Sequence, residues 1–274
     1  MAEPVEVGKG AGGEGIIHGH GWILAGGSIL LGIWLTRLHS FLLFHSLAEL
    51  FSIAIAFGIF AVAWNCRRLL ENNYLLFLGI AYLFVAGVDT IHTLAYKGMG
   101  VFVGYDANLP TQLWIVARYL ESLSFLIAPF FLRRQMMAPA VFCVFGLVVA
   151  LALASIFHWS IFPDCFIEGK GLTTFKKVSE YIICTILVGS VALLIQERRN
   201  FTRRVLVWLV WSVATTVASE LAFTMYVSVY GIPNIAGHLL KIVSFYLLYR
   251  AIIQTGLTEP YALCGRTLCR AMRC

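Results

Sequence analysis

Long apolar runs separated by short polar segments dominate the chain. Eight runs stand out, most of them about 20 residues long, the length of an α-helix that crosses the hydrocarbon core of a bilayer. They cover residues 20–36, 40–64, 74–96, 112–132, 138–158, 179–196, 205–229 and 234–254. The pattern predicts an all-α, polytopic helical bundle with about eight transmembrane helices. The first run is the weakest, because Gly26 and Gly27 interrupt it.

The composition agrees with a membrane protein. Hydrophobic residues make up 60% of the chain and charged residues only 12%, with a mean hydropathy of +0.84. Soluble domains carry about 25% charged residues. A net charge of +6 would suggest nucleic acid in a soluble protein. In a membrane protein basic residues gather in cytoplasmic loops instead, so we expect lipid around the chain and no nucleic-acid partner.

The positions of Lys and Arg predict the orientation of the bundle. With both termini cytoplasmic, thirteen of the 20 Lys and Arg residues fall in inner segments and five, including Lys176, fall in outer loops. The opposite orientation places every arginine pair outside, against the positive-inside rule. We therefore predict that both termini are cytoplasmic. The inner pairs are Arg67–Arg68, Arg133–Arg134, Arg198–Arg199 and Arg203–Arg204.

Two short tails flank the predicted membrane domain. Residues 1–16 are rich in Gly and Glu and lack a basic start, so they are predicted to be a flexible N-terminal tail rather than a cleavable signal. Residues 17–258 form the membrane domain. Residues 259–274 form a basic cytoplasmic tail that is too short for a further domain. The seven Cys show no paired spacing of a zinc ribbon, and Cys165 stands alone in an outer loop, where we expect no internal disulfide.

Ionisable residues inside the apolar runs give the first indication of function. The stretch Val88–Met99 places Asp89, His92 and Tyr96 at i, i+3 and i+7, on one face of a helix. Ionisable groups at membrane depth are costly and usually belong to a functional site. We therefore expect the rest of the chain to bring further polar residues to this face.

Five other predicted helices carry polar residues at the same depth. Under the predicted orientation all of them lie in the outer half of the bilayer, whereas the inner halves carry almost no charge. The sequence therefore predicts one polar site built by six helices. The residues are His45 and Glu49; Trp114, Arg118 and Glu121; Ser179 and Glu180; Ser219 and Glu220; and Asn234, His238 and Lys241.

Several roles for this site stay open at this point. One is structural: Arg118 pairs with Glu121 within a helix, and the pairs hold the bundle together without a ligand. In that interpretation Lys241 neutralises Glu220. Another is a metal site, because imidazole and carboxylate ligands suit divalent metals. Its ligands would be His45, Glu49, Asp89, His92 and His238.

Two further occupants fit the same residues. Two of the histidines are candidate axial ligands of a b-type haem, although the absence of C-x-x-C-H excludes covalent haem. A small organic ligand in an aromatic-lined pocket is the other, with Tyr96, Trp114 and Tyr119 as walls.

Five blocks of the sequence, in order, resemble a known family. They are H-S-L-A-E-L-F-S-I-A-I-A (45–56), L-F-V-A-G-V-D-T-I-H-T-L-A-Y-K-G-M (83–99), T-Q-L-W-I-V-A-R-Y-L-E-S (111–122), F-P-D-C-F-I-E-G-K-G-L-T (162–173) and G-H-L-L-K-I-V-S-F-Y-L-L-Y-R-A-I (237–252). They resemble MASE3, a bacterial membrane-associated sensor domain, over about residues 20–260. The resemblance implies a multi-pass protein of the bacterial inner membrane that precedes signalling modules such as PAS, histidine kinase or GGDEF domains.

The chain departs from that family pattern at its end. The family segment after T-G-L-x-x-P-Y continues as a helix into the output module, whereas here Y-A-L-C-G-R-T-L-C-R-A-M-R-C closes the sequence. We expect either a stand-alone sensor or a copy without its output domain. We expect no enzymatic activity, because no Ser or Cys nucleophile pairs with a base and no phosphate-binding loop is present.

The favoured hypothesis is a sensory input domain. An unidentified ligand or cofactor binds in the outer polar pocket, and the last helix relays the change to the cytoplasm. The expected partner is a second copy of the chain or a separate cytoplasmic signalling protein. The alternatives are a haem- or metal-binding redox protein and a small-solute transporter. The transporter has the least support, because neither a polar exit path nor an inverted repeat is evident.

Overall fold

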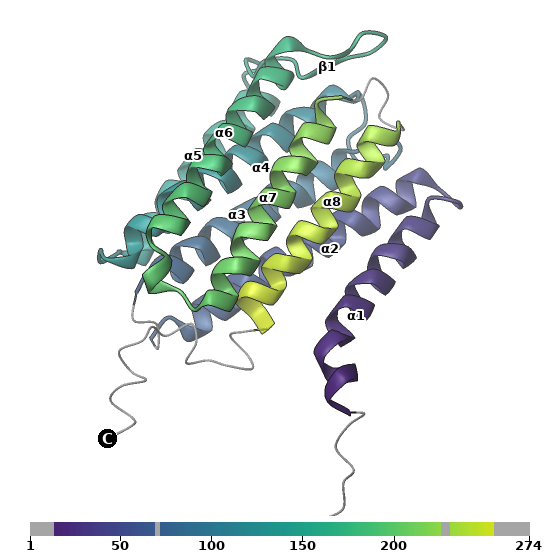
Figure 1. Cartoon of the computed structure of the whole chain (residues 1–274). Coiled ribbons are helices and arrows are strands. Elements are labelled where there is room, and N and C mark those ends of the chain that lie inside the picture. The colour runs from purple at the N-terminus through teal and green to yellow at the C-terminus, as the bar shows by residue number, and fades with distance from the viewer. Residues whose placement is uncertain (1–13, 69–71, 226–230, 255–274) are drawn as a thin grey trace, which may run out of the picture.

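The apolar runs fold into eight α-helices in the computed structural model, which describes residues 14–68, 72–225 and 231–254 (Figure 1). The helices are α1 (Glu14–Thr36), α2 (Phe41–Cys66), α3 (Tyr74–Ala95), α4 (Asn108–Ile127), α5 (Ala138–Phe157), α6 (Thr174–Gln196), α7 (Arg203–Phe223) and α8 (Ile232–Tyr249). Seven of these are long and apolar enough to cross a bilayer, and the apolar part of α1, Gly21–Thr36, is shorter. The predicted all-α membrane bundle is confirmed.

The predicted tails fall mostly outside the described part of the chain. Residues 1–13 and 259–274 lie outside it, and residues 14–16 form the start of α1.

Caps, rather than the ends of apolar runs, set several helix boundaries. The Thr173 side chain accepts a hydrogen bond from the Lys176 backbone N–H at 3.2 Å, so α6 begins five residues before the predicted position 179. The Thr202 hydroxyl caps α7 in the same way through Val205. A capping hydroxyl satisfies a backbone donor that has no partner within the helix. Sequence hydropathy does not register such a residue, because it lies among polar neighbours.

Short elements complete the chain. A 3-10 turn, η1 (Ala128–Leu132), follows α4 where Pro129 removes a backbone donor, and η2 (Arg198–Asn200) follows α6. A π-helical turn, η3 (Arg250–Gln254), follows α8. The strands β1 (Phe166–Ile167) and β2 (Gly171–Leu172) form a small antiparallel hairpin.

The helices differ strongly in burial. α3 is the most buried and packs against α2, α4 and α5, whereas α7 and α8 pack on each other. α1 lies at the edge of the bundle, along α2 and α8 (Figure 1). α5 is strongly apolar, yet Ile156 is its only buried residue, and Val144 and Leu147 are 59% and 61% exposed. Such a continuous apolar surface fits contact with lipid rather than water.

The two ends of the bundle differ in chemistry. The start of α3 meets the end of η1, where the Asn73 N–H donates to the Phe131 carbonyl, and Arg133 pairs with Glu197 at 2.8 Å. This end carries the arginine pairs, and we call it the arginine end. The opposite end carries β1 and β2 (Figure 1), and we call it the hairpin end.

The loop that contains the hairpin is fastened to the start of α4. The Asn108 side-chain oxygen accepts from the backbone N–H groups of Cys165 and Phe166 at 2.8 and 3.1 Å, and its amide donates to Asp164. The Gln112 amide donates to the carbonyls of Phe162 and Pro163, each at 3.1 Å. One helix turn of α4 therefore holds the loop over the hairpin end.

A close approach between α2 and α3 generates a first prediction. A Cβ atom on Gly79 would lie 2.4 Å from the Cβ of Ala63, whereas one on Gly87 meets nothing within 4 Å. We expect Gly79→Ala to destabilise the protein by about 1–3 kcal/mol through overpacking. The matched variant Gly87→Ala on the same helix should be neutral or stabilising, since Ala favours a helix more than Gly. Thermal unfolding in detergent compares the two, and equal melting temperatures would contradict the α2–α3 contact.

Burial of Cys165 generates a second prediction. Burial against the apolar core raises the pKa of the Cys165 thiol to about 12. Only the thiolate is nucleophilic, so at pH 8 alkylation should be roughly 1000-fold slower than for an ordinary exposed thiol. The rate should rise about tenfold per pH unit above pH 8, because the thiolate fraction does. Mass spectrometry of maleimide-treated protein measures this, with Ile167→Cys on the exposed side of β1 as the control. Equal alkylation rates at the two positions would show that the Cys165 thiol is not buried.

Candidate functional site

Six helices bring their polar side chains together in the half of the bundle nearest the hairpin end. The residues come from the start of α2 and α8, the end of α3 and α7, and the facing turns of α4 and α6. All eleven predicted site residues are buried, and even Tyr96 is only 7% exposed. They are His45, Glu49, Asp89, His92, Tyr96, Trp114, Arg118, Glu121, Glu220, His238 and Lys241.

Arg118 is the centre of a buried ion-pair network. Its Nη2 donates to both carboxylate oxygens of Asp89 at 2.7 and 3.0 Å, and its Nη1 donates to Glu121. The Tyr82 hydroxyl donates to the other oxygen of Glu121 at 2.8 Å. The pair expected within α4 is therefore present, and it extends to α3 through Asp89. Because the two terminal nitrogens of the guanidinium hold different carboxylates, the orientation of Arg118 is fixed as well as its distance from each acid.

Lys241 carries the network into α8 and α2. Its ammonium donates to Glu49 Oε2 at 2.6 Å and to Asp89 Oδ2 at 3.3 Å. The sequence-based interpretation that Lys241 neutralises Glu220 is wrong. The first turns of α8 face α2 and α3, whereas the end of α7 turns Glu220 toward α4 and α6.

Glu220 belongs to a neighbouring group centred on Trp114. The indole N–H of Trp114 lies 3.2 Å from Glu180 Oε1 and 3.3 Å from Glu220 Oε2. Lys176 pairs with Glu180 one turn along α6 and is 1% exposed. The prediction that Lys176 lies in an outer loop is therefore wrong, because the Thr173 cap starts the helix early and turns this side chain into the bundle.

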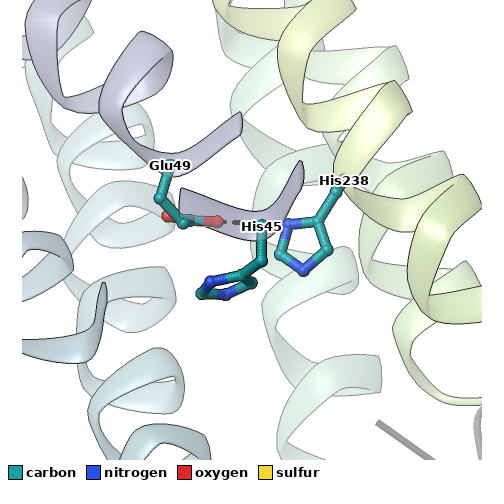
Figure 2. A group of neighbouring side chains, drawn as sticks. All are labelled: His45, Glu49 and His238. Carbon is teal, nitrogen blue, oxygen red and sulfur yellow. Dashed lines mark ion pairs between the residues drawn. The ribbon is translucent and has the colours of Figure 1, made fainter. Parts of the chain in front are cut away.

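The remaining donors form a histidine–carboxylate group. His45 stacks on Tyr96 with ring centroids 3.6 Å apart, and His238 meets His45 edge-on at 4.8 Å. His238 Nδ1 lies 3.2 Å from Glu49 Oε1, close enough for an ion pair but without the alignment of a hydrogen bond. One ligand atom from each of His45, Glu49 and His238 lies within 4.8 Å of the others (Figure 2).

Several polar atoms of this group are buried without a hydrogen bond in the described structure. They include both ring nitrogens of His45, Oε1 of Glu49, Nδ1 of His238 and Nε2 of His92. An unsatisfied buried polar group usually costs about 1–3 kcal/mol, so four side chains of this kind in one place call for a partner.

His92 and Asp89, the other two proposed metal ligands, lie outside the group formed by His45, Glu49 and His238. His92 Nδ1 lies 2.7 Å from the Pro110 carbonyl, which only accepts, so this nitrogen carries the proton and Nε2 is left as a bare acceptor. Nε2 of His92 has no described partner, and the ring lies 5.6 Å from that of His45. Asp89, by contrast, is held by Arg118 and Lys241 and is not part of the histidine–carboxylate group.

A small cavity of about 30 Å³ adjoins these side chains. His45, His92 and His238 line it together with Tyr96 and Trp114. A space of this size suits an ion with a water molecule, and it is far too small for the macrocycle of a haem. Tyr119, expected as a third wall, packs against the apolar core instead.

The formal charges of the buried cluster do not balance. Among the described residues, the buried carboxylates outnumber the buried cations by two, if the histidines are neutral and the acids are ionised. Two protons or one divalent cation would offset the difference. The acids are Glu49, Asp89, Glu121, Glu180 and Glu220, and the bases are Arg118, Lys176 and Lys241.

The sequence pattern missed part of this arrangement. Lys176 and Glu180 stand at i, i+4, a spacing that signals a helical pair once the helix start is known. Tyr82 and Phe223 lie in apolar runs, so the sequence pattern did not indicate that they belong to the site. The Tyr82 hydroxyl donates a hydrogen bond to Glu121, and the ring centroids of Phe223 and Trp114 are 4.7 Å apart.

Comparison with protein-family models gives a match to a membrane domain. The family model MASE3, described as a membrane-associated sensor domain, matches residues 36–260. The matched region contains α2 to α8 and therefore every residue of the buried cluster. Neither the curated proteins nor the solved structures contain a match to the chain.

The network around Arg118 leads to a third prediction. Arg118→Met leaves Asp89 and Glu121 without their shared cation, and breaking such a buried pair should cost about 3–5 kcal/mol of folding free energy. Arg133→Met is the matched control, because Arg133 pairs with Glu197 while 74% exposed, and its loss should cost about 1 kcal/mol or less. Thermal unfolding of both variants in detergent checks the difference. Equal stability of the two variants would show that the buried network does not hold the helices together.

Proposed function

The chain belongs to the MASE3 family of membrane-associated sensor domains, and from this premise we propose that its buried histidine–carboxylate group binds the sensed ligand. In this proposal α8 passes the occupancy of the site along the bundle. The site lies toward the outer face of a bacterial inner membrane, and the signal leaves at the arginine end. The positive-inside rule supports that orientation, since the arginine pairs gather at one end.

The observation that carries the proposal is the position of Lys241. This α8 side chain donates to Glu49 of α2 and Asp89 of α3, and His238 one turn earlier faces the same Glu49. A ligand that engages Glu49 or His238 therefore acts directly on the contact of α8 with α2 and α3. From Lys241 to Arg250 at the arginine end, α8 rises about 14 Å at 1.5 Å per residue.

α7 and α8 are joined so that they can move together. The Ser212 hydroxyl donates to the Ser244 carbonyl at 2.9 Å, the hydroxyls of Thr216 and Ser244 lie 2.6 Å apart, and the Ser219 hydroxyl donates to the Gly237 carbonyl at 2.8 Å. Within residues 231–254 and the described part of α2, the polar contacts from α8 to α2 are the ion pairs of Glu49 with His238 and Lys241. A change at Glu49 would then slide the α7–α8 pair against α2 and α3, a small shear of packed helices.

A haem redox protein, the principal alternative, has less support from the site. The cavity of about 30 Å³ leaves no room for a porphyrin between His45, His92 and His238. The proposed partner is a second copy of the chain or a separate cytoplasmic signalling protein at the arginine end.

A fusion protein tests the relay and forms the fourth prediction. Residues 1–258 are joined to a cytoplasmic histidine kinase, and autophosphorylation is measured in membranes. The double variant Glu49→Gln/Lys241→Met removes the α2–α8 ion pair but leaves no unpaired charge at those positions. We expect its basal output to differ from that of the parent by about fivefold or more, since about 1 kcal/mol already shifts a two-state equilibrium by that factor.

The control is Lys177→Met, which removes an exposed lysine one residue after Lys176. It should leave the output unchanged. An unchanged output in the double variant, at equal abundance in the membrane, would overturn the proposed relay.

A further inference from the structure

We propose that His45, Glu49 and His238 bind a divalent first-row transition-metal ion, which names the ligand class of the site and rests on the proposed sensor function. Two imidazoles and one carboxylate come from two helices here. His45 and Glu49 stand four residues apart on α2, and His238 approaches from α8 (Figure 2). The i, i+4 spacing is the one that presents two ligands to a single ion on helical metal sites.

The spacing of the donor atoms fits a small ion. Ligand atoms at 2.0–2.1 Å around a tetrahedral metal lie about 3.3 Å from one another. His238 Nδ1 and Glu49 Oε1 are already 3.2 Å apart. One ligand atom from each of the three residues lies within 4.8 Å of the other two. Rotation of the His45 ring away from Tyr96 is the movement that remains, and it leaves both backbones in place.

Buried ligand atoms that lack a hydrogen bond give an independent reason to expect a metal ion. The site holds both nitrogens of His45, Nδ1 of His238 and Oε1 of Glu49 at 0–2% exposure, and none has a hydrogen bond among the described residues. Neutral imidazole presents one bare nitrogen lone pair, and carboxylate oxygen presents others. A cation is the one kind of partner that satisfies three acceptors at once.

The donor types select the class of metal. Mg²⁺ and Ca²⁺ prefer oxygen ligands throughout, whereas imidazole suits zinc, copper, iron and nickel. In the part of the chain that the structure describes, no cysteine joins the group, so a metal that prefers thiolate ligands is not favoured. Two imidazoles and one carboxylate leave coordination positions open, and the adjoining cavity is lined by both imidazoles and by His92.

The charge of the buried cluster points the same way. If all five acids are ionised, they exceed the bases by two, and one divalent cation at this group would offset that excess. Uncompensated charge at membrane depth is costly, and neutralisation removes that cost.

Metal binding would also change the contact of α8 with α2 and α3, because the Glu49 carboxylate takes part in both the metal site and that contact. Glu49 Oε2 holds Lys241, while Oε1 faces the metal position. An ion on Oε1 withdraws negative charge from Lys241 and repels its ammonium. Asp89 Oδ2, 3.3 Å from the ammonium, is the acceptor toward which Lys241 would move. The metal would thus loosen the contact of α8 with α2 and strengthen its contact with α3.

Metal analysis of the full chain tests the inference and forms the fifth prediction. The protein is purified in detergent without a polyhistidine tag and carries His18→Ala/His20→Ala, so that the N-terminal histidines do not contribute. After chelation and reloading with Zn²⁺, elemental mass spectrometry should find about one equivalent per chain. Loading with Co²⁺ should give the visible d–d absorption of a protein-bound ion.

Matched variants separate a built site from surface binding. His238→Gln and Glu49→Gln should each weaken Zn²⁺ binding about 100-fold or more, since even groups that only support a ligand contribute 10–100-fold. His158→Ala, which changes an exposed histidine at the end of α5, should leave binding unchanged. Circular dichroism confirms that each variant folds. Absence of stoichiometric metal, or equal binding by all variants, would overturn the inference.

The two proposals fail in different ways. If Glu49→Gln/Lys241→Met shifts kinase output but the protein binds no metal, the relay stands and the metal assignment falls. If Zn²⁺ binds with the expected variant pattern but the same double variant leaves the output unchanged, the metal site stands and the relay falls.

Discussion

The structure depends on a chain of ion pairs at membrane depth that runs from Glu121 through Arg118, Asp89 and Lys241 to Glu49. These five side chains come from α2, α3, α4 and α8, and each is at most 3% exposed. A single buried charge without its partner is strongly unfavourable in an apolar surrounding. The four helices are therefore constrained to the rotation and depth at which all five charges meet. Apolar packing alone does not impose such a constraint, because lipid competes equally well for apolar faces.

This network divides the polar cluster into two parts with different roles. Asp89 and Glu121 are engaged on both oxygens and act as structural acceptors. Glu49 accepts a hydrogen bond on one oxygen only, and its other oxygen lies 3.2 Å from His238 Nδ1 without a hydrogen bond. The same carboxylate therefore belongs to the framework and to the candidate ligand site. That shared position is the physical basis on which occupancy of the site would alter the packing of α8.

The arrangement also explains the loop at the hairpin end. Asn108 and Gln112 on the first turns of α4 fasten the loop, and Trp114 and Arg118 on the following turns reach the cluster. Lys176, at the start of α6 just after the loop, pairs with Glu180 beside Trp114. One helix thus couples the covering loop to the buried charges.

The sequence by itself determined the helices and the polar faces that meet in the buried cluster. Apolar run length gave α2 to α8, since a bilayer sets the length of a spanning helix. The i, i+4 spacing put His45 on the same helix face as Glu49, and the i, i+3 spacing put His238 on the same face as Lys241. It did not determine which helix each charge faces. Lys241 selects Glu49 and Asp89 over Glu220, and Tyr119 turns away from the cavity, because the rotation of a helix is set by all its neighbours together. It also left Lys176 in a loop, because a single hydroxyl cap decides where α6 begins. Pairing across helices is a tertiary property, and only the packed bundle decided it.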